Sequence, residues 1–253
     1  MLSIIIPVLN EAGTIAKLLE HLSENANPEH ITEIIAVDGG STDETVKILQ
    51  TLSEKHISFN LKLVHAKKGR ASQMNAGAAI ATGKILYFLH ADSFPPKKFD
   101  GYIIDEIKKG NPAGCFRMRF NSNHWWLKLI GWFTKFSWRA CRGGDQSQFI
   151  TRKLFDKIGG YDENYVIYED NILINALYAR NSFVVIPHCL NTSARLYERK
   201  GVFYVQYHFL YIYFKRWRGA DAGELLAYYK KHLRYNQNTG NVPIEETQNI
   251  ITE

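Results

Sequence analysis

Three short polar sequences hold the side chains that could do chemistry in this chain of 253 residues. The stretch Leu86-Tyr-Phe-Leu-His-Ala-Asp92 is an apolar run that ends in an imidazole and a carboxylate. Val37-Asp-Gly-Gly-Ser-Thr-Asp43 places another carboxylate directly after an apolar run, and Tyr168-Glu-Asp170 adds two adjacent acids. Carboxylates in such positions can bind a hard divalent cation or act as a general base. Their use depends on whether the fold brings them together.

Apolar runs that predict strands alternate with helical patterns along the first half of the chain. The predicted strands are residues 3–7, 33–38, 61–65 and 84–90, and the predicted helices are residues 14–23, 43–53 and 70–81. A capping-box pattern, Ser41-Thr-Asp-Glu44, predicts the start of the second helix. Strands that are apolar on both faces and separated by helices predict an α/β fold with a mostly parallel sheet flanked by helices. We therefore expect the polar strand ends to meet on one rim of that sheet.

The second half of the chain is less regular. The predicted strands are Ala113–Phe120, where apolar and basic residues alternate, and residues 183–187. The predicted helices are residues 123–139, 152–158, 170–180, 201–217 and 224–235. We expect residues 1–200 to form the main domain, residues 201–235 to form a C-terminal helical appendage packed on it, and residues 236–253 to form a loose tail.

Charge and composition indicate the compartment of the chain but do not identify the ligand that it binds. The net charge of +6 and the isoelectric point near 9.1 suit phosphate-bearing ligands, an anionic membrane surface or nucleic acid alike. The three cysteines are far apart and form no CxxC pair, which favours a reducing cytoplasm. We expect neither a signal peptide nor a transmembrane helix. No recognisable nucleic-acid module appears, which argues against nucleic acid as a partner.

Two stretches combine aromatic and basic side chains. Residues 125–138 hold Trp and Phe beside Lys128 and Lys135, and residues 203–217 are apolar with Lys215 and Arg216 at their end. This composition suits peripheral contact with the inner face of a membrane, and it would suit a lipid-linked acceptor. The same residues also suit core packing or a homodimer contact, and the composition does not decide between these interpretations.

Five motifs, taken in order, resemble glycosyltransferase family 2. They are Ile4-Ile-Ile-Pro-Val-Leu-Asn-Glu11, Val37-Asp-Gly-Gly-Ser-Thr-Asp43, Gly69-Arg-Ala-Ser-Gln-Met-Asn-Ala-Gly77, Phe88-Leu-His-Ala-Asp92 and Tyr168-Glu-Asp170. The likeness covers about residues 2–199 and is greatest to the branch with His-Ala-Asp in place of Asp-x-Asp. It implies a GT-A fold, which is a Rossmann-like sheet of nucleotide-diphospho-sugar transferases. It also implies an inverting transfer from a UDP- or GDP-type nucleotide-sugar and a divalent cation, Mg²⁺ or Mn²⁺.

The resemblance implies a role for individual residues. The residues implied to contact the nucleotide are Pro7, Asn10, Glu11, Asp38, Arg70 and His90. Asp92 matches the metal ligand, and Asp170 matches the catalytic base, with Glu169 as its rival. Asp145 and Gln146 are implied to lie near the sugar or the acceptor, with a simple polar turn as the alternative. Arg195 belongs to a basic run that could reach the diphosphate, although such a run is more commonly solvated. His90 departs from the family's acid, and because a neutral imidazole suits Mn²⁺ better than Mg²⁺, the preferred metal stays open.

Two other functions compete with a hexosyl transfer. A nucleotidyltransferase also uses a parallel sheet and a metal, but it would need an early Gly-rich loop with a basic residue, which residues 7–13 lack. A non-catalytic membrane-surface protein of the same fold would keep its function after Asp170→Asn. Nucleotide binding and turnover separate these alternatives.

Overall fold

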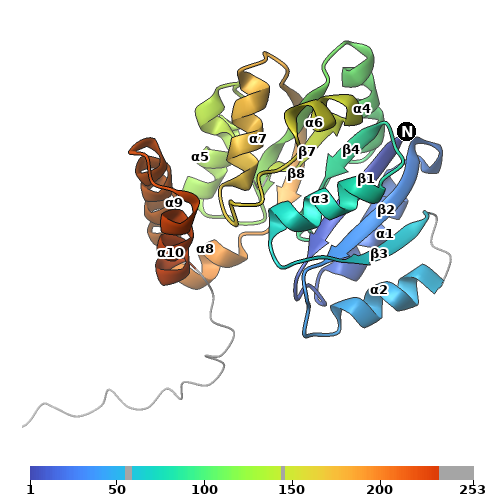
Figure 1. The fold of residues 1–253 in the computed structure, drawn as a ribbon, viewed down its shortest axis with the longest axis horizontal. Helices are drawn as coiled ribbons and strands as arrows, with labels where there is room; N and C mark the ends of the chain where they lie inside the picture. Colours follow the sequence, from blue (N-terminus) through green and yellow to red (C-terminus); the bar gives the residue numbers. More distant parts are fainter. Residues whose placement is uncertain (55–58, 144–145, 234–253) are drawn as a thin grey trace, which may run out of the picture.

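The computed structural model describes residues 1–54, 59–143 and 146–233, and a mixed eight-stranded sheet lies at its centre (Figure 1). The strands are β1 Leu2–Val8, β2 Ile31–Asp38, β3 Leu61–His65, β4 Ile85–Phe88, β5 Ser93–Phe94, β6 Ala113–Phe120, β7 Gln148–Thr151 and β8 Val184–Thr192. The helices are α1 Ile15–Asn25, α2 Thr45–Glu54, α3 Arg70–Ile80, α4 Phe99–Lys108, α5 Trp125–Phe133, α6 Arg152–Ile158, α7 Glu169–Tyr178, α8 Arg195–Lys200, α9 Val202–Trp217 and α10 Ala222–His232. The strand order across the sheet is β3-β2-β1-β4-β7-β6-β8-β5.

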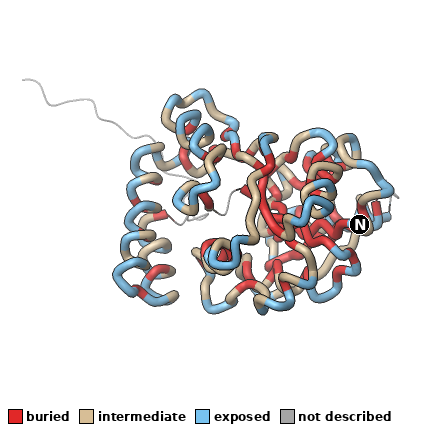
Figure 2. The backbone as a smooth tube through the Cα atoms, turned by 90° about the horizontal axis from the view of Figure 1, so that it is seen from above, coloured by how far each residue is buried: buried red, intermediate tan, exposed pale blue. Residues whose placement is uncertain are grey.

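The first four strands in this order form the predicted parallel half of the sheet. β1 pairs in parallel with β2 and with β4, and β2 pairs in parallel with β3. β1 is buried along its whole length because alternate residues face two different cores. Ile4 and Ile6 pack in the core that contains α1 and α4, whereas Ile5 packs in the core that contains α3 and α7. Helices therefore cover both faces, and buried residues concentrate along the sheet (Figure 2).

The second half of the sheet reverses direction. β7 is antiparallel to both β4 and β6, while β8 is parallel to β6 and antiparallel to β5. β5, β7, α4 and α8 have no counterpart among the predicted elements, and the two strands are too short to show a period. β8 continues past Pro187, where the prediction ended it. The register with β6 jumps from Ile186 to Cys189, so a bulge accommodates a residue that cannot donate to the ladder.

The predicted helix at residues 123–139 ends early, at Phe133. Thr134 stops it, because its hydroxyl donates to the Gly131 carbonyl at 2.6 Å and accepts from the Met118 amide at 2.9 Å. These bonds tie the end of α5 to β6. The chain then passes through a short 3-10 turn, Arg139–Cys141, before it re-enters the sheet.

The C-terminal helices α8, α9 and α10 follow one another and lie together at one end of the molecule, away from β3 and α2 (Figure 1). α9 packs against both α8 and α10. In the described part of the chain, no helix is long and apolar enough to cross a bilayer. The predicted tail at residues 236–253 and the end of the predicted last helix lie outside the described residues.

Gly77 allows α3 to approach the sheet closely. A Cβ atom at this position would lie 2.5 Å from Ile5 Cγ2 and 3.0 Å from Val37 Cγ2. We expect Gly77→Ala to lower the free energy of unfolding by about 1–3 kcal/mol through overpacking. Gly101 in α4 is the matched control, because a Cβ there meets nothing within 4 Å. Gly101→Ala should raise stability by up to about 1 kcal/mol, and urea unfolding of both variants checks the pair.

Candidate functional site

The loops that follow β1 and β2 are bonded to each other at the rim of the sheet. Asn10 donates its backbone N–H to Ser41 Oγ at 2.9 Å, and its side-chain oxygen accepts the Thr42 N–H at 2.8 Å. Asn10 has φ +57°, a left-handed conformation that Asn tolerates better than most residues. Ser41 therefore serves the first loop instead of capping α2 as predicted. Asp43 takes the capping role, because it accepts the Thr45 N–H at 3.0 Å.

Asp38 is buried at the end of β2 and held by a tight turn. Its carboxylate accepts the N–H groups of Gly40 and Ser41, each at 3.0 Å, and His65 Nδ1 lies 3.3 Å from it. Burial alone would raise the pKa of Asp38, but the hydrogen bonds from Ser41, Gly40 and His65 outweigh burial and lower it. Asp38 therefore stays ionised and is a fixed acceptor at the rim.

Gln73 has no predicted role, but it fixes the position of these two loops. Its side-chain amide donates to the carbonyls of Val8 and Val37, at 2.8 and 2.7 Å. These carbonyls lie near the ends of β1 and β2. A Cβ atom on Gly39 would lie 2.9 Å from the Gln73 side chain, so the glycine lets the amide pass. Pro7 is one of the residues predicted to contact the nucleotide. It is buried within β1, beyond the last β1 residue that pairs with β4.

Arg195, at the start of α8, connects two of the predicted strand-end acids. Its Nη2 lies 2.9 Å from Glu11 Oε1 and 3.0 Å from Asp92 Oδ2. Burial lowers the pKa of Arg195, but the bonds to Glu11 and Asp92 outweigh it and raise the pKa. The three side chains are all partly exposed, so a ligand can reach them. The fold thus brings together residues that are 184 positions apart in the chain.

The donor atoms around Asp92 fit a cation shared with a ligand better than a resident metal. Within residues 1–54, 59–143 and 146–233, no group of three His, Cys, Asp or Glu side chains is placed to hold a metal ion. Asp92 is also not a helix cap, since α4 begins at Phe99 and is preceded by Lys98. Mg²⁺ and Mn²⁺ in phosphate-binding sites commonly use one or two protein carboxylates together with phosphate oxygens and water. Asp92 meets that requirement.

A second charged group forms where α3 meets α7. Arg70 Nε lies 2.7 Å from Glu169 Oε1, and Arg70 Nη2 lies 3.9 Å from Asp170 Oδ2. The side chain of Glu169 is 0% exposed. Burial raises the pKa of Glu169 to about 7, although the Arg70 guanidinium opposes this rise. Tyr168, directly before the helix, has φ +73°, a strained conformation for a non-glycine residue.

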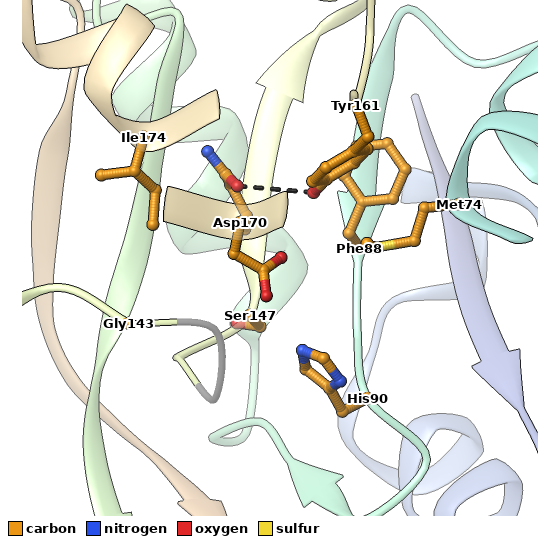
Figure 3. Close-up of a pocket in the computed structure, with 9 residues that line it drawn as sticks. Met74, Phe88, His90, Gly143, Ser147, Tyr161, Asp170 and Ile174 are labelled. Atoms are coloured by element: carbon orange, nitrogen blue, oxygen red, sulfur yellow. Dashed lines mark hydrogen bonds between the residues drawn. The ribbon is translucent and has the colours of Figure 1, made fainter. Parts of the chain in front are cut away.

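Asp170 and His90 both line one pocket (Figure 3). The other residues that line it are Met74, Phe88, Gly143, Ser147, Gln148, Tyr161 and Ile174. The Asp170 carboxylate and the His90 ring point toward one another across the pocket (Figure 3). Glu169 does not line this pocket, so the two adjacent acids have different surroundings. Asp170 faces the space where a substrate could react, whereas Glu169 holds Arg70.

The predicted polar loop at residues 145 and 146 reaches the pocket through its neighbours. Gln146 is buried, and its side chain bonds Arg142 at 3.0 Å and the Cys141 carbonyl at 3.0 Å. Asp145 lies outside the described residues. Ser147, at φ +57°, and Gln148 line the pocket instead, and Tyr161 donates to Gln148 at 3.4 Å. No pattern in the sequence marks these last three residues, because Ser147 and Gln148 depend on the start of β7, and Asn75 of α3 holds the backbone of Tyr161.

Comparison with known proteins decides the family. A model of the family described as "Glycosyl transferase family 2" matches residues 3–163. The chain belongs to glycosyl transferase family 2. The match begins in β1 and ends after α6, so it contains the loops after β1 and β2 and most of the residues that line the pocket. It favours a glycosyltransferase over the two competing functions.

Two relatives of this family 2 member have names that describe glycosyltransferases. The chain is 28% identical over 195 residues to the probable glycosyltransferase YdaM of Bacillus subtilis (strain 168), which covers 70% of this chain but 46% of that protein. It is 23% identical over 247 residues to a Methanococcus voltae protein, covering 82% of this chain and 77% of the other. That protein is named dolichyl N-acetyl-alpha-D-glucosaminyl phosphate 3-beta-D-2,3-diacetamido-2,3-dideoxy-beta-D-glucuronosyltransferase. The chain thus spans about half the length of the Bacillus relative.

Solved structures confirm the expected GT-A fold. The mannosyltransferase PcManGT from Pyrobaculum calidifontis, in complex with GDP-Man and Mn²⁺, matches with a TM-score of 0.66 and 19% identity. The match covers 92% of this chain and 67% of that one. At this identity the likeness establishes the fold, which is a mixed α/β sheet flanked by helices.

Proposed function

We propose that this family 2 member is an inverting, cation-dependent glycosyltransferase that uses a UDP- or GDP-type nucleotide-sugar. One observation carries the proposal: Asp170 and His90 face each other across one pocket, and His90 is two residues from Asp92. This supports the proposal that a candidate base and a candidate cation ligand belong to one site. The family match and the PcManGT structure with GDP-Man and Mn²⁺ support the same conclusion.

The loops after β1 and β2 provide the nucleoside side of the proposed mechanism. The ionised Asp38 is an acceptor for N–H or O–H groups of a base or ribose, and Asn10 and Gln73 keep the loops in place. Preformed hydrogen bonds of this kind lower the cost of ordering the site when the ligand binds. Arg195 is near enough to Asp92 to contact a diphosphate bound there.

Asp92 would hold the divalent cation together with the diphosphate of the donor. The cation would neutralise the charge that develops on the leaving diphosphate. Arg195 balances part of the charge of Glu11 and Asp92 before the ligand arrives. When the donor binds, the same guanidinium can turn to a phosphate oxygen, which it recognises by charge-assisted hydrogen bonds.

Asp170 would accept the proton of the acceptor hydroxyl. An inverting transfer needs a base on the face of the sugar opposite the leaving group, and Asp170 enters the pocket from α7, a separate element from the loop with Asp92. Arg70 and Glu169 fix the start of α7 and so position this base. We also propose a lipid-linked acceptor, supported by the dolichyl phosphate in the name of the Methanococcus relative.

Nucleotide-dependent melting tests the donor site. UDP or GDP with Mn²⁺, at about a hundred times its dissociation constant, should stabilise the chain by about 2.7 kcal/mol, which raises Tm by roughly 5–10 °C. Asp92→Asn should remove most of this shift, and Asp105→Asn on the exposed face of α4 should retain it. No shift with any nucleotide would contradict the proposal. Assays of slow hydrolysis with a panel of nucleotide-sugars then identify the nucleobase and the sugar of the donor.

A further inference from the structure

The large apolar side chains that are exposed gather on one part of the surface. In the described residues, all such side chains except Met1, Ile80 and Val166 lie on α5, on the turn after it, or on α9. On α9 they are Phe203, Tyr204, Tyr207, Leu210, Tyr211, Phe214 and Trp217. On α5 and the turn they are Trp125, Leu129, Trp132, Phe133 and Trp138. Large exposed apolar side chains that gather in one region mark an interaction surface.

The exposed side chains on α9 form a stripe along the whole helix. Phe203, Tyr207, Leu210, Phe214 and Trp217 recur at intervals of four and three residues, which places them on one face. They are 45–81% exposed. The opposite face already packs on the protein through Val205, His208 and Ile212. The stripe therefore faces away from the side of α9 that is buried against the protein.

A shorter stripe on α5 adjoins the one on α9. Trp125, Leu129 and Trp132 share a face opposite the buried Leu127. The ring of Phe203, which begins the α9 stripe, lies 6.3 Å from Trp125 and 5.8 Å from Trp126. The two stripes thus meet and form one aromatic face, defined here as the exposed residues of α5 and α9.

The charged residues within the two segments that carry the aromatic face are all basic. Residues 121–142 and 201–220 contain no Asp or Glu. The basic residues beside the stripes are Lys128, Lys135, Lys215, Arg216 and Arg218, all exposed or partly exposed. Lys135 Nζ lies 3.5 Å above the Trp132 ring. Asp221 and Glu224, which follow α9 in the chain, form a capping box with each other at the start of α10.

We propose that the aromatic face docks on an anionic lipid bilayer. Trp and Tyr favour the membrane–water interface, Leu and Phe insert below the headgroups, and Lys and Arg attract anionic lipids. A second copy of this chain fits the same face poorly, because a two-fold contact would place basic residues against basic residues. The inference does not depend on the transfer reaction.

Vesicle co-sedimentation of the full chain tests this inference. We expect binding to phosphatidylcholine vesicles that contain about one third phosphatidylglycerol to be at least about tenfold tighter than to phosphatidylcholine alone. High salt should weaken the binding. The double variant Leu210→Ser/Trp217→Ser should lower affinity for the mixed vesicles about tenfold or more. Circular dichroism and melting curves should show that this exposed double variant remains folded.

A charge-reversal pair separates electrostatic from apolar contributions. Lys128→Glu/Arg218→Glu should abolish the preference for phosphatidylglycerol. Lys17→Glu/Lys153→Glu makes the same change in net charge on exposed positions of α1 and α6 and should leave it intact. The proposal is overturned if the wild-type chain ignores the mixed vesicles or if both charge variants behave alike. It is also overturned if sedimentation shows a dimer that Leu210→Ser/Trp217→Ser dissociates.

Discussion

Asp170→Asn should slow sugar transfer by about a hundred- to ten-thousand-fold while leaving donor binding nearly unchanged. The amide has almost the same shape as the carboxylate but cannot accept the proton of the attacking hydroxyl. Asp170 lines the pocket opposite His90, whereas we assign the nucleoside to the loops that contain Asn10 and Asp38. Single-turnover rates, together with the melting shift given by the nucleotide, measure the two effects separately.

Two further variants make this result interpretable. Asp156→Asn makes the same chemical change on the exposed face of α6, where the carboxylate only lies 3.9 Å from Arg152, and it should leave the rate unaltered. Glu169→Gln tests the rival base. A large rate loss in Glu169→Gln together with a rate within about threefold of wild type in Asp170→Asn would assign the base to Glu169 and refute our assignment.

Arg70→Met should lower the free energy of unfolding by about 3 kcal/mol at pH 8. The change removes the guanidinium that lies 2.7 Å from Glu169, whose side chain is 0% exposed, and leaves a buried carboxylate without its partner. Glu169 Oε2 has no other hydrogen-bond partner in the described part of the chain. Glu169→Gln in the Arg70→Met background should recover most of the lost stability, because it removes the buried charge.

The cost of Arg70→Met should depend on pH. The pKa of Glu169 is raised by burial from an ordinary 4.5 to about 7, so the folded chain keeps this proton at pH values where the unfolded chain has released it. The contribution of Glu169 to the free energy of unfolding therefore falls as the pH rises from about 4.5 to about 7, and Glu169→Gln should remove that slope. At pH 5 the carboxyl is neutral, and the loss of Arg70 should matter less.

Urea unfolding at pH 5 and pH 8 measures this dependence. Lys47→Met serves as the matched control, because Lys47 and Glu44 form an exposed ion pair at 2.8 Å. Its loss should cost less than about 1 kcal/mol at either pH. An equal cost of Arg70→Met at both pH values, or no recovery with Glu169→Gln, would contradict the proposed origin of the effect.

The parallel half of the sheet and the polar strand ends could be predicted because their signals are local. An apolar run followed by Asn10, Asp38 or His90 shows both the strand and its end within a few residues. The capping-box pattern predicts that Ser41 caps the start of α2, but the Ser41 hydroxyl instead accepts a hydrogen bond from the Asn10 N–H. That competition involves a residue 31 positions away, which a local pattern does not contain.

The rest of the site depends on contacts that only the folded chain makes. Gln148 reaches the pocket because β7 pairs antiparallel with β4, opposite Phe88. The different surroundings of Glu169 and Asp170 arise at the start of α7, where Glu169 contacts Arg70 and Asp170 lines the pocket. Two adjacent carboxylates have identical local sequence signals, and only tertiary packing can bury one and direct the other into the pocket.

The shortness of α8 keeps Arg195 close to the start of the aromatic face. Arg195 begins this helix of 6 residues, and α9 with its aromatic face starts directly after Gly201. At 1.5 Å per residue, α8 spans about 9 Å. If α9 rests at the headgroups, a diphosphate bound at Arg195 would lie within roughly one such helix length of the start of α9. A lipid whose hydroxyl projects that far can then be glycosylated without being lifted out of its leaflet.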